Sequence, residues 1–219
     1  MKRIIRFAPL VSACLVLIAC ASEPQAAAGR DNRGLPLAGV PKGDPAKAGE
    51  GAEARAALER PAFQNGEYRE AKGGFSIAVP DAWSAASGDY SPYQFIKGPE
   101  EAGFTANIAF VDEPYSGPVT AFVDSSLDSL IGERVLSDFE LLRRDSFRTD
   151  QGIQGEYIIF QGRDPHTSQA IQQRLYFLPD QEGAVMMIIV CSSSPAGGEK
   201  YAGLFDGCVR TFKWAQESP

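Results

Sequence analysis

The chain has 219 residues, of which 21 are basic and 28 acidic, giving a formal net charge of −7. Nucleic acid and anionic lipid both repel an acidic surface, so this composition argues against either as the main partner. A single histidine in the whole chain excludes a zinc or iron site built from several histidines.

The N-terminal segment has the pattern of a signal peptide. Lys2, Arg3 and Arg6 form a basic start, and residues 7–19 form an apolar run of thirteen. A helix needs about 20 apolar residues to span a bilayer, so this run is too short for a membrane span and fits a signal sequence. We therefore predict a signal peptide over residues 1–19.

The end of this segment, Leu17-Ile18-Ala19-Cys20, resembles the bacterial lipobox. The resemblance implies that the thiol of Cys20 is acylated and becomes the lipid-bearing N-terminus after cleavage. Ala21 stands where retained inner-membrane lipoproteins often carry Asp, which favours the outer membrane, facing the periplasm, in a cell that has two membranes. An ordinary secretory signal, with Cys20 incidental, is the alternative.

A neutral tether is predicted after the anchor, over residues 20–60. Residues 21–60 contain 11 Ala, 6 Gly, 4 Pro and no aromatic residue, a composition that cannot bury enough apolar surface to fold. The tether has six acids and six bases, and the signal segment has three bases. Residues 61–219 therefore keep 12 bases and 22 acids, and we expect them to form one acidic domain.

In the first half of this domain, apolar and polar residues alternate as they do in β-strands. The apolar residues then recur with the period of a helix. Strands are expected near 68–71 and at 75–80, 93–97 and 105–111. A helix is expected over 118–132, with Pro118 in its first turn and Ser116 as a candidate N-cap. Its apolar face comprises Val119, Phe122, Val123, Leu127, Leu130 and Ile131.

Four strands are predicted next, at about 138–148, 153–161, 168–178 and 184–192. The connections between them are rich in turn residues, which favours antiparallel hairpins. The segment "AVMMIIVC" (184–191) is apolar on both faces and predicts a central strand covered on both sides. A second helix is expected at about 199–212. This order predicts an α+β fold, with an antiparallel sheet of about seven strands and helices packed on it.

Four motifs lie along the predicted domain: "GGFSIAVPDAW" (73–83), "GIQGEYIIFQG" (152–162), "QAIQQRLYF" (169–177) and "VRTFKW" (209–214). Together they resemble PsbP-like domains, which include photosystem II subunits, a nuclear Ran-binding protein and DcrB-type bacterial envelope lipoproteins. The resemblance covers about residues 66–214 and implies the same α+β fold. Members bind proteins or stabilise complexes and share no catalytic set, so no residue role carries over.

No catalytic, cofactor-binding or metal-binding residue is predicted. His166 lies in the turn-like "GRDPHTS" with only Asp164 beside it, and an exposed turn residue is the preferred interpretation. The acidic clusters lack the alternating pattern of a calcium loop and are interpreted as solvated charge. They are Asp112 with Glu113, Asp124 with Asp128, and Glu100 with Glu101.

Cys191 and Cys208 remain after signal cleavage, and the oxidising envelope makes a disulfide worth weighing. Cys208 lies nine residues into the predicted helix, about 14 Å from its start. A disulfide requires Cα atoms within about 7 Å, so two separate buried thiols are favoured. A Cys191–Cys208 disulfide stays the alternative if the "SSSPAGG" segment folds back and brings the two residues together.

Two sets of side chains are candidates for an exposed recognition surface, with an ordinary strand face as the alternative in each case. The first set is Tyr90, Tyr93 and Phe95, and the second is Gln172, Arg174 and Tyr176.

The sequence thus predicts a non-enzymatic, membrane-anchored envelope lipoprotein that binds a protein partner. A binder of a small ligand or metal ion, using space between sheet and helix, is the alternative, and a hydrolase with an unrecognised arrangement is a third. A deep pocket with converging polar groups would favour a ligand, and a shallow exposed aromatic patch would favour a protein.

Overall fold

The structure of the protein is a computed structural model that describes residues 63–64, 66–88, 91–101 and 103–215. The predicted signal peptide, Cys20 and the tether 20–60 lie outside these residues. Within them, no helix has both the length and the apolar character that a membrane crossing requires.

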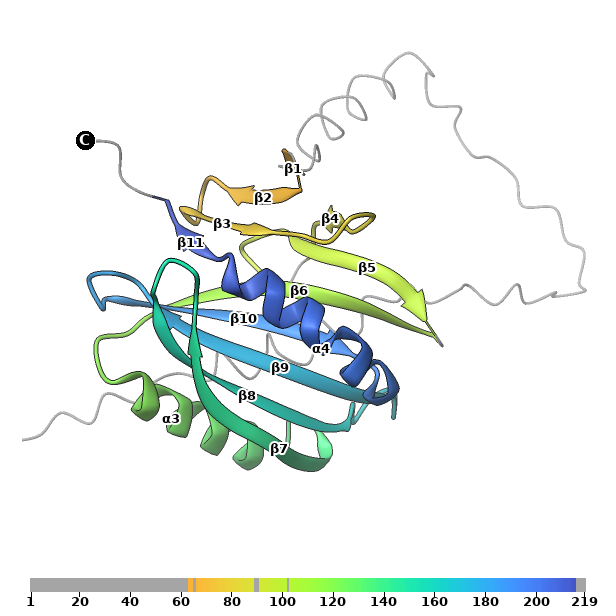
Figure 1. The fold of residues 1–219 in the computed structure, drawn as a ribbon. Coiled ribbons are helices and arrows are strands. Elements are labelled where there is room, and N and C mark those ends of the chain that lie inside the picture. The colour runs from red at the N-terminus through yellow and green to blue at the C-terminus, as the bar shows by residue number, and fades with distance from the viewer. Residues whose placement is uncertain (1–62, 65, 89–90, 102, 216–219) are drawn as a thin grey trace, which may run out of the picture. The chain divides into compact units, whose positions relative to one another are not determined.

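A seven-stranded antiparallel sheet forms the centre of the domain (Figure 1). Its strands lie in the order β4-β5-β6-β10-β9-β8-β7. Their bounds are β4 Ser84–Ala86, β5 Phe95–Glu101, β6 Phe104–Pro114, β7 Ser137–Arg148, β8 Gln154–Arg163, β9 Ala170–Pro179 and β10 Val185–Ser193. The predicted α+β class, the antiparallel sheet and the hairpin succession from β7 to β10 are confirmed.

A second, smaller sheet has the order β1-β2-β3-β11. Its strands are β1 Phe63–Gln64, β2 Glu67–Glu70, β3 Phe75–Ala78 and β11 Lys213–Trp214. The strand patterns near 68–71 and 75–80 predict β2 and β3 but not their separate sheet. That sheet is extended by β11, which pairs with β3 from the other end of the domain.

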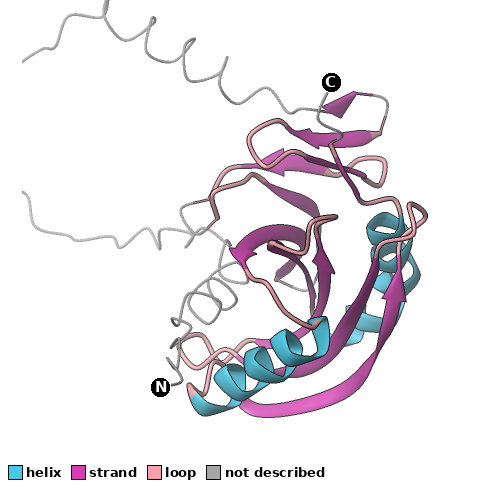
Figure 2. Cartoon of the chain, turned by 90° about the vertical axis from the view of Figure 1, so that its left-hand side faces the viewer, coloured by secondary structure: helices cyan, strands magenta, loops and turns pink. Residues whose placement is uncertain are grey.

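The two described helices, α3 (Val119–Gly132) and α4 (Pro195–Arg210), cover opposite faces of the large sheet (Figure 2). Phe122 and Leu130 of α3 belong to one core cluster, and Phe205 of α4 belongs to the other. β10 lies between β6 and β9, with Ile188 on the α3 side and Ile189 on the α4 side. The prediction of a central strand covered on both faces is therefore confirmed.

Helix α4 begins at Pro195, four residues before the predicted start at 199. The Ser194 hydroxyl caps it by accepting a hydrogen bond from the Gly197 N–H at 3.1 Å. Gly198 lies so close to the Gln172 side chain of β9 that a Cβ there would displace it. Gly198, although glycine weakens a helix in isolation, allows α4 to approach β9 closely.

Helix α3 matches its prediction in extent but differs in two details. Its N-cap is Pro118, which offers no side-chain hydrogen bond, so the expected cap by Ser116 is wrong. Ile131, expected on the buried stripe, is 55% exposed. The helix packs against β8 and β9. Helical periodicity shows which face is apolar but not how much of that face the sheet covers.

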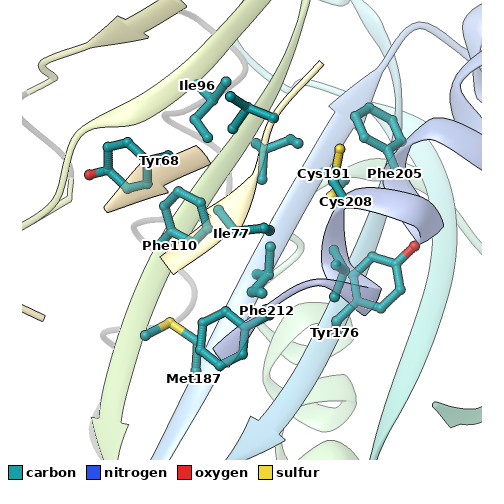
Figure 3. Packing of buried hydrophobic residues seen from close by; sticks show 14 of the residues in the cluster. Tyr68, Ile77, Ile96, Phe110, Tyr176, Met187, Cys191, Phe205, Cys208 and Phe212 are labelled. Carbon is teal, nitrogen blue, oxygen red and sulfur yellow. The ribbon is translucent and has the colours of Figure 1, made fainter. Parts of the chain in front are cut away.

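The core between α4 and the two sheets is rich in aromatic side chains (Figure 3). Tyr68 of the small sheet stacks on Phe110 of β6 with ring centroids 5.6 Å apart. Cys191 and Cys208 both lie in this cluster, buried and without a disulfide. The preferred prediction of two buried, unbonded thiols agrees with the structure, although both belong to one cluster rather than to separate parts of the core.

A candidate protein-docking edge

Neither predicted recognition set forms an exposed surface. In the first, Tyr93 is buried and Phe95 is half-buried, while Tyr90 lies outside the described residues. In the second, Tyr176 is fully buried beneath α4. For the described members of both sets, the interpretation as ordinary strand residues is the correct one.

The second set instead attaches α4 to the sheet. The Tyr176 hydroxyl donates a hydrogen bond to the Asp206 carboxylate of α4. Arg174 Nη1 lies 3.3 Å from the same carboxylate oxygen. Burial and the contact with Asp206 hold the pKa of Tyr176 well above its usual value.

His166 is exposed in the turn between β8 and β9. The backbone N–H groups of His166 and Thr167 donate to Asp164 Oδ1 at 2.7 and 2.8 Å. Asp164 therefore stabilises the turn through the backbone of this segment. The exposed position of His166 in this turn agrees with the interpretation from the sequence.

The acidic clusters do not converge on a common point. Asp124 pairs with Arg144, and Glu101 pairs with Lys200. Glu113 is half-buried, and burial followed by the charge of Asp112 raises its pKa to about 7. No group of three or more His, Cys, Asp or Glu side chains that could hold a metal ion occurs in the described part of the chain.

A cavity of about 600 Å³ lies beside the small sheet rather than between sheet and helix, where a ligand site was expected. Its lining includes Arg69, Phe75, Lys213 and Trp214. The two cations already contact Glu67, with Arg69 Nε at 2.8 Å and Lys213 Nζ at 2.8 Å. Hydrogen bonds from Lys213 and then Arg69 lower the pKa of Glu67 to about 2. A charged ligand would have to compete with these pairs.

Strand β7 forms one edge of the large sheet and differs from the other edge in length. It has 12 residues, whereas β4 at the opposite edge has three. Only Phe147 of β7 is buried, and most of the strand is exposed. Within the described residues β7 pairs with β8 alone, so its outer side presents a row of backbone N–H and C=O groups without strand partners.

Two exposed leucines lie on this edge strand. Ile131, Leu141 and Leu142 are the large hydrophobic residues that are exposed in the described part of the chain. Leu141 and Leu142 occupy the middle of β7, where the pairing with β8 shifts and Leu142 becomes the extra residue of a β-bulge. Ile131 is the penultimate residue of α3. The adjacent leucines on an edge strand are apolar surface that an added strand would cover.

The edge strand is also held firmly in place. Arg144 Nη1 lies 2.5 Å from Asp124 of α3, and its Nε lies 2.9 Å from Glu156 of β8. A third contact, at 3.3 Å, joins Arg144 to the carbonyl oxygen of Thr120. These contacts hold the edge strand in one position against both α3 and β8.

Sequence reasoning predicts β7 as a strand but not as an edge. The segment "SDFELLRRDSFR" is polar on both faces, which is the signal that could have identified an edge strand. Its adjacent leucines break the alternation, which is the signal for the bulge.

Comparison with known protein families and with curated protein sequences gives no match. Among solved structures, the chain is similar to cyanobacterial PsbP (CyanoP) from Synechocystis sp. PCC 6803, with 13% identity, 68% of this chain and 91% of that chain covered, and a TM-score of 0.51. It is also similar to LpqN of Mycobacterium tuberculosis, which is described as involved in cell envelope biogenesis. The identity is 11%, the match covers 65% of this chain and 83% of LpqN, and the TM-score is 0.50. The Saccharomyces cerevisiae Ran-binding protein Mog1p has 12% identity, with 70% of this chain and 97% of Mog1p covered and a TM-score of 0.49. The protein therefore has a PsbP-like α+β fold.

Proposed function

We propose that the protein is a lipid-anchored envelope lipoprotein that has no enzymatic activity and binds a protein partner along the outer edge of β7. The observation that carries this proposal is the exposed 12-residue edge strand with Leu141 and Leu142 at its centre. Cys20 supplies the anchor, and the tether 20–60 holds the acidic domain away from the lipid headgroups.

Strand addition is the binding mode that such an edge supports. An incoming extended segment would pair its backbone with the free N–H and C=O groups of β7, and apolar side chains of that segment would cover the leucines. The hydrogen bonds supply affinity, and the side chains at the bulge restrict which segments fit.

The polar groups of the domain support a binding role over a catalytic one. His166 projects from an exposed turn, and the cations at the cavity are bound by Glu67. The involvement of LpqN in cell envelope biogenesis is consistent with an envelope location, here on the outer membrane facing the periplasm.

The proposal is tested by site-specific photo-crosslinking of the full chain in cells. The photo-reactive amino acid p-benzoylphenylalanine replaces Leu142, and a matched control places it at Lys97, an exposed position on β5 in the other half of the sheet. We expect a protein adduct from position 142 and none from position 97. Equal yields from both positions, or no adduct from 142, would contradict the proposal.

The cavity beside the small sheet supports a second candidate function, binding of a small ligand or ion. Its volume of about 600 Å³ falls within the range of small-molecule sites. Native mass spectrometry of protein released gently from membranes is the test. A bound small molecule that a Trp214→Ala substitution removes would favour this function over the docking edge.

A further inference from the structure

The pairing with β8 defines which face of the sheet each residue of β7 occupies. Arg143 lies opposite Ile159, whose side chain packs in the α4-side cluster, and Glu140 lies opposite Gln161, two residues further along the same strand. Arg143 and Glu140 therefore share the α4 face.

The residues flanking this pair lie on the opposite face. Arg144 is opposite Ile158, which belongs to the α3-side cluster. Phe139 stacks on Phe160 of the same cluster, with ring centroids 5.2 Å apart. Phe139 and Arg144 therefore share the α3 face.

The β-bulge makes this arrangement symmetric about the Leu141–Leu142 bond. In a regular strand, residues 140 and 143 would point to opposite faces, because the side-chain period is two. The extra residue Leu142 brings Glu140 and Arg143 onto one face. For two residues on either side of the leucines the faces then follow the same order, up to a second register shift between Ser137 and Glu140.

From this symmetry we infer that the β7 edge is occupied by a second copy of the same chain, paired antiparallel about a twofold axis between Leu141 and Leu142. Glu140 of each copy would lie opposite Arg143 of the other on the α4 face. Phe139 of each would lie opposite Arg144 of the other on the α3 face. Four leucines would meet at the centre, and two seven-stranded sheets would become one.

Charge distribution along β7 supports this occupant. Asp138 and Glu140 precede the leucines, and Arg143, Arg144 and Arg148 follow them together with Asp145. Antiparallel self-pairing therefore places an acidic half against a net basic half and sets Glu140 opposite Arg143, although Asp138 then lies opposite Asp145. Arg143 already pairs with Asp145 of its own strand at 2.8 Å, so the pair across the axis would compete with this contact. Glu140 accepts a hydrogen bond from Gln161 at 2.8 Å but has no ion pair with a basic side chain among the described residues.

The net charge of −10 on residues 61–219 opposes association of two copies at long range. This repulsion is screened beyond about 8 Å at physiological ionic strength, whereas the pairs across the edge are in direct contact. Anchoring both copies to one membrane raises their effective concentration and further favours pairing.

This inference rests on the proposed docking role of β7 and deepens it by naming the partner. The test uses the full chain in cells with p-benzoylphenylalanine in place of Leu142, and mass spectrometry of the adduct. We expect an adduct of two identical chains. An adduct with a different protein and no self-adduct would overturn the inference but leave the docking edge in place, and no adduct at all would overturn both.

Charge-swap variants distinguish specific pairing from random collision. Glu140→Arg and Arg143→Glu each place two like-charged pairs across the axis, which should weaken self-association by roughly tenfold. The double variant restores opposite charges and should recover most of the adduct. Glu199→Arg, which makes the same charge change at an exposed position of α4, is the matched control and should have no effect. Failure of the double variant to recover the adduct would contradict the proposed register.

Discussion

Arg144 of the edge strand β7 contacts Asp124 of helix α3, with Nη1 and Oδ1 2.5 Å apart. The same guanidinium reaches Glu156 on β8 through Nε at 2.9 Å. One side chain therefore joins the edge strand, its neighbouring strand and the helix on that face. This contact fixes the position of the docking edge relative to the rest of the domain.

Loss of this contact should weaken the domain measurably. Arg144→Ala removes both ion pairs and leaves the more buried partner, Glu156, without its cation, so we expect a loss of about 1–2 kcal/mol in the free energy of unfolding. Arg143→Ala breaks a more exposed pair with Asp145 and should cost about 0.5 kcal/mol or less. Urea denaturation of both variants measures the difference, and equal losses would show that Arg144 has no special role.

The raised pKa of Glu113 leads us to expect an unusual pH dependence of the free energy of unfolding. Its pKa is raised from 4.5 to about 7 by burial and by Asp112, so the folded state favours the protonated carboxyl. The stability that it contributes is fully present below about pH 4.5 and is lost as the pH rises through about 7. Glu113→Gln should remove this loss and make the protein more stable than the wild type at pH 8, by on the order of 1 kcal/mol.

Denaturant unfolding at pH 5 and pH 8 measures this effect, with Glu199→Gln as a control at an exposed position. A Glu113→Gln variant that is less stable than the wild type at both pH values would indicate that the ionised carboxylate stabilises the fold, contrary to this account.

At Gly155 the sheet leaves no room for a side chain. A Cβ at this position would overlap the backbone carbonyl oxygen of Phe177 in the neighbouring strand β9, and that atom cannot move without shifting the strand. Gly155→Ala should therefore cost at least about 2 kcal/mol. Gly203 lies on the exposed side of α4, and a Cβ added there would meet no other atom within 4 Å. Gly203→Ala should therefore stabilise the protein by up to about 1 kcal/mol. Thermal unfolding of the two variants should show shifts of opposite sign.

Sequence patterns predict those elements whose own composition reveals their burial. The strand at 184–191 is apolar on both faces, and that alone indicates a central position. The edge position of β7 and the exposure of Ile131 depend on where the sheet ends, which periodicity does not encode. The fourth strand of the small sheet pairs through Lys213 and Trp214 with Ser76 and Phe75, a contact between opposite ends of the domain. The matching faces beside the leucines follow from the register shift at Leu142, one of two along β7, and become visible only with the pairing to β8.

The proposed lipid anchor at Cys20 gives a prediction about membrane attachment. Cys20→Ser should leave the protein uncleaved or soluble, because the hydroxyl cannot take the place of the acylated thiol. Detergent extraction and fractionation of membranes measure the change, with Cys208→Ser as a control that keeps Cys20. A Cys20→Ser variant that still fractionates with membranes as the wild type does would exclude the lipid anchor.

The central claim, that the β7 edge docks a protein, is tested most directly by photo-crosslinking from position 142 in the anchored chain. The account predicts a discrete protein adduct that is absent when the probe is at Lys97. Where the partner is a second copy, the adduct has twice the mass of the cleaved chain and is reduced by Glu140→Arg. A chain that shows no adduct from position 142, while the same probe elsewhere on the domain does react, would contradict it.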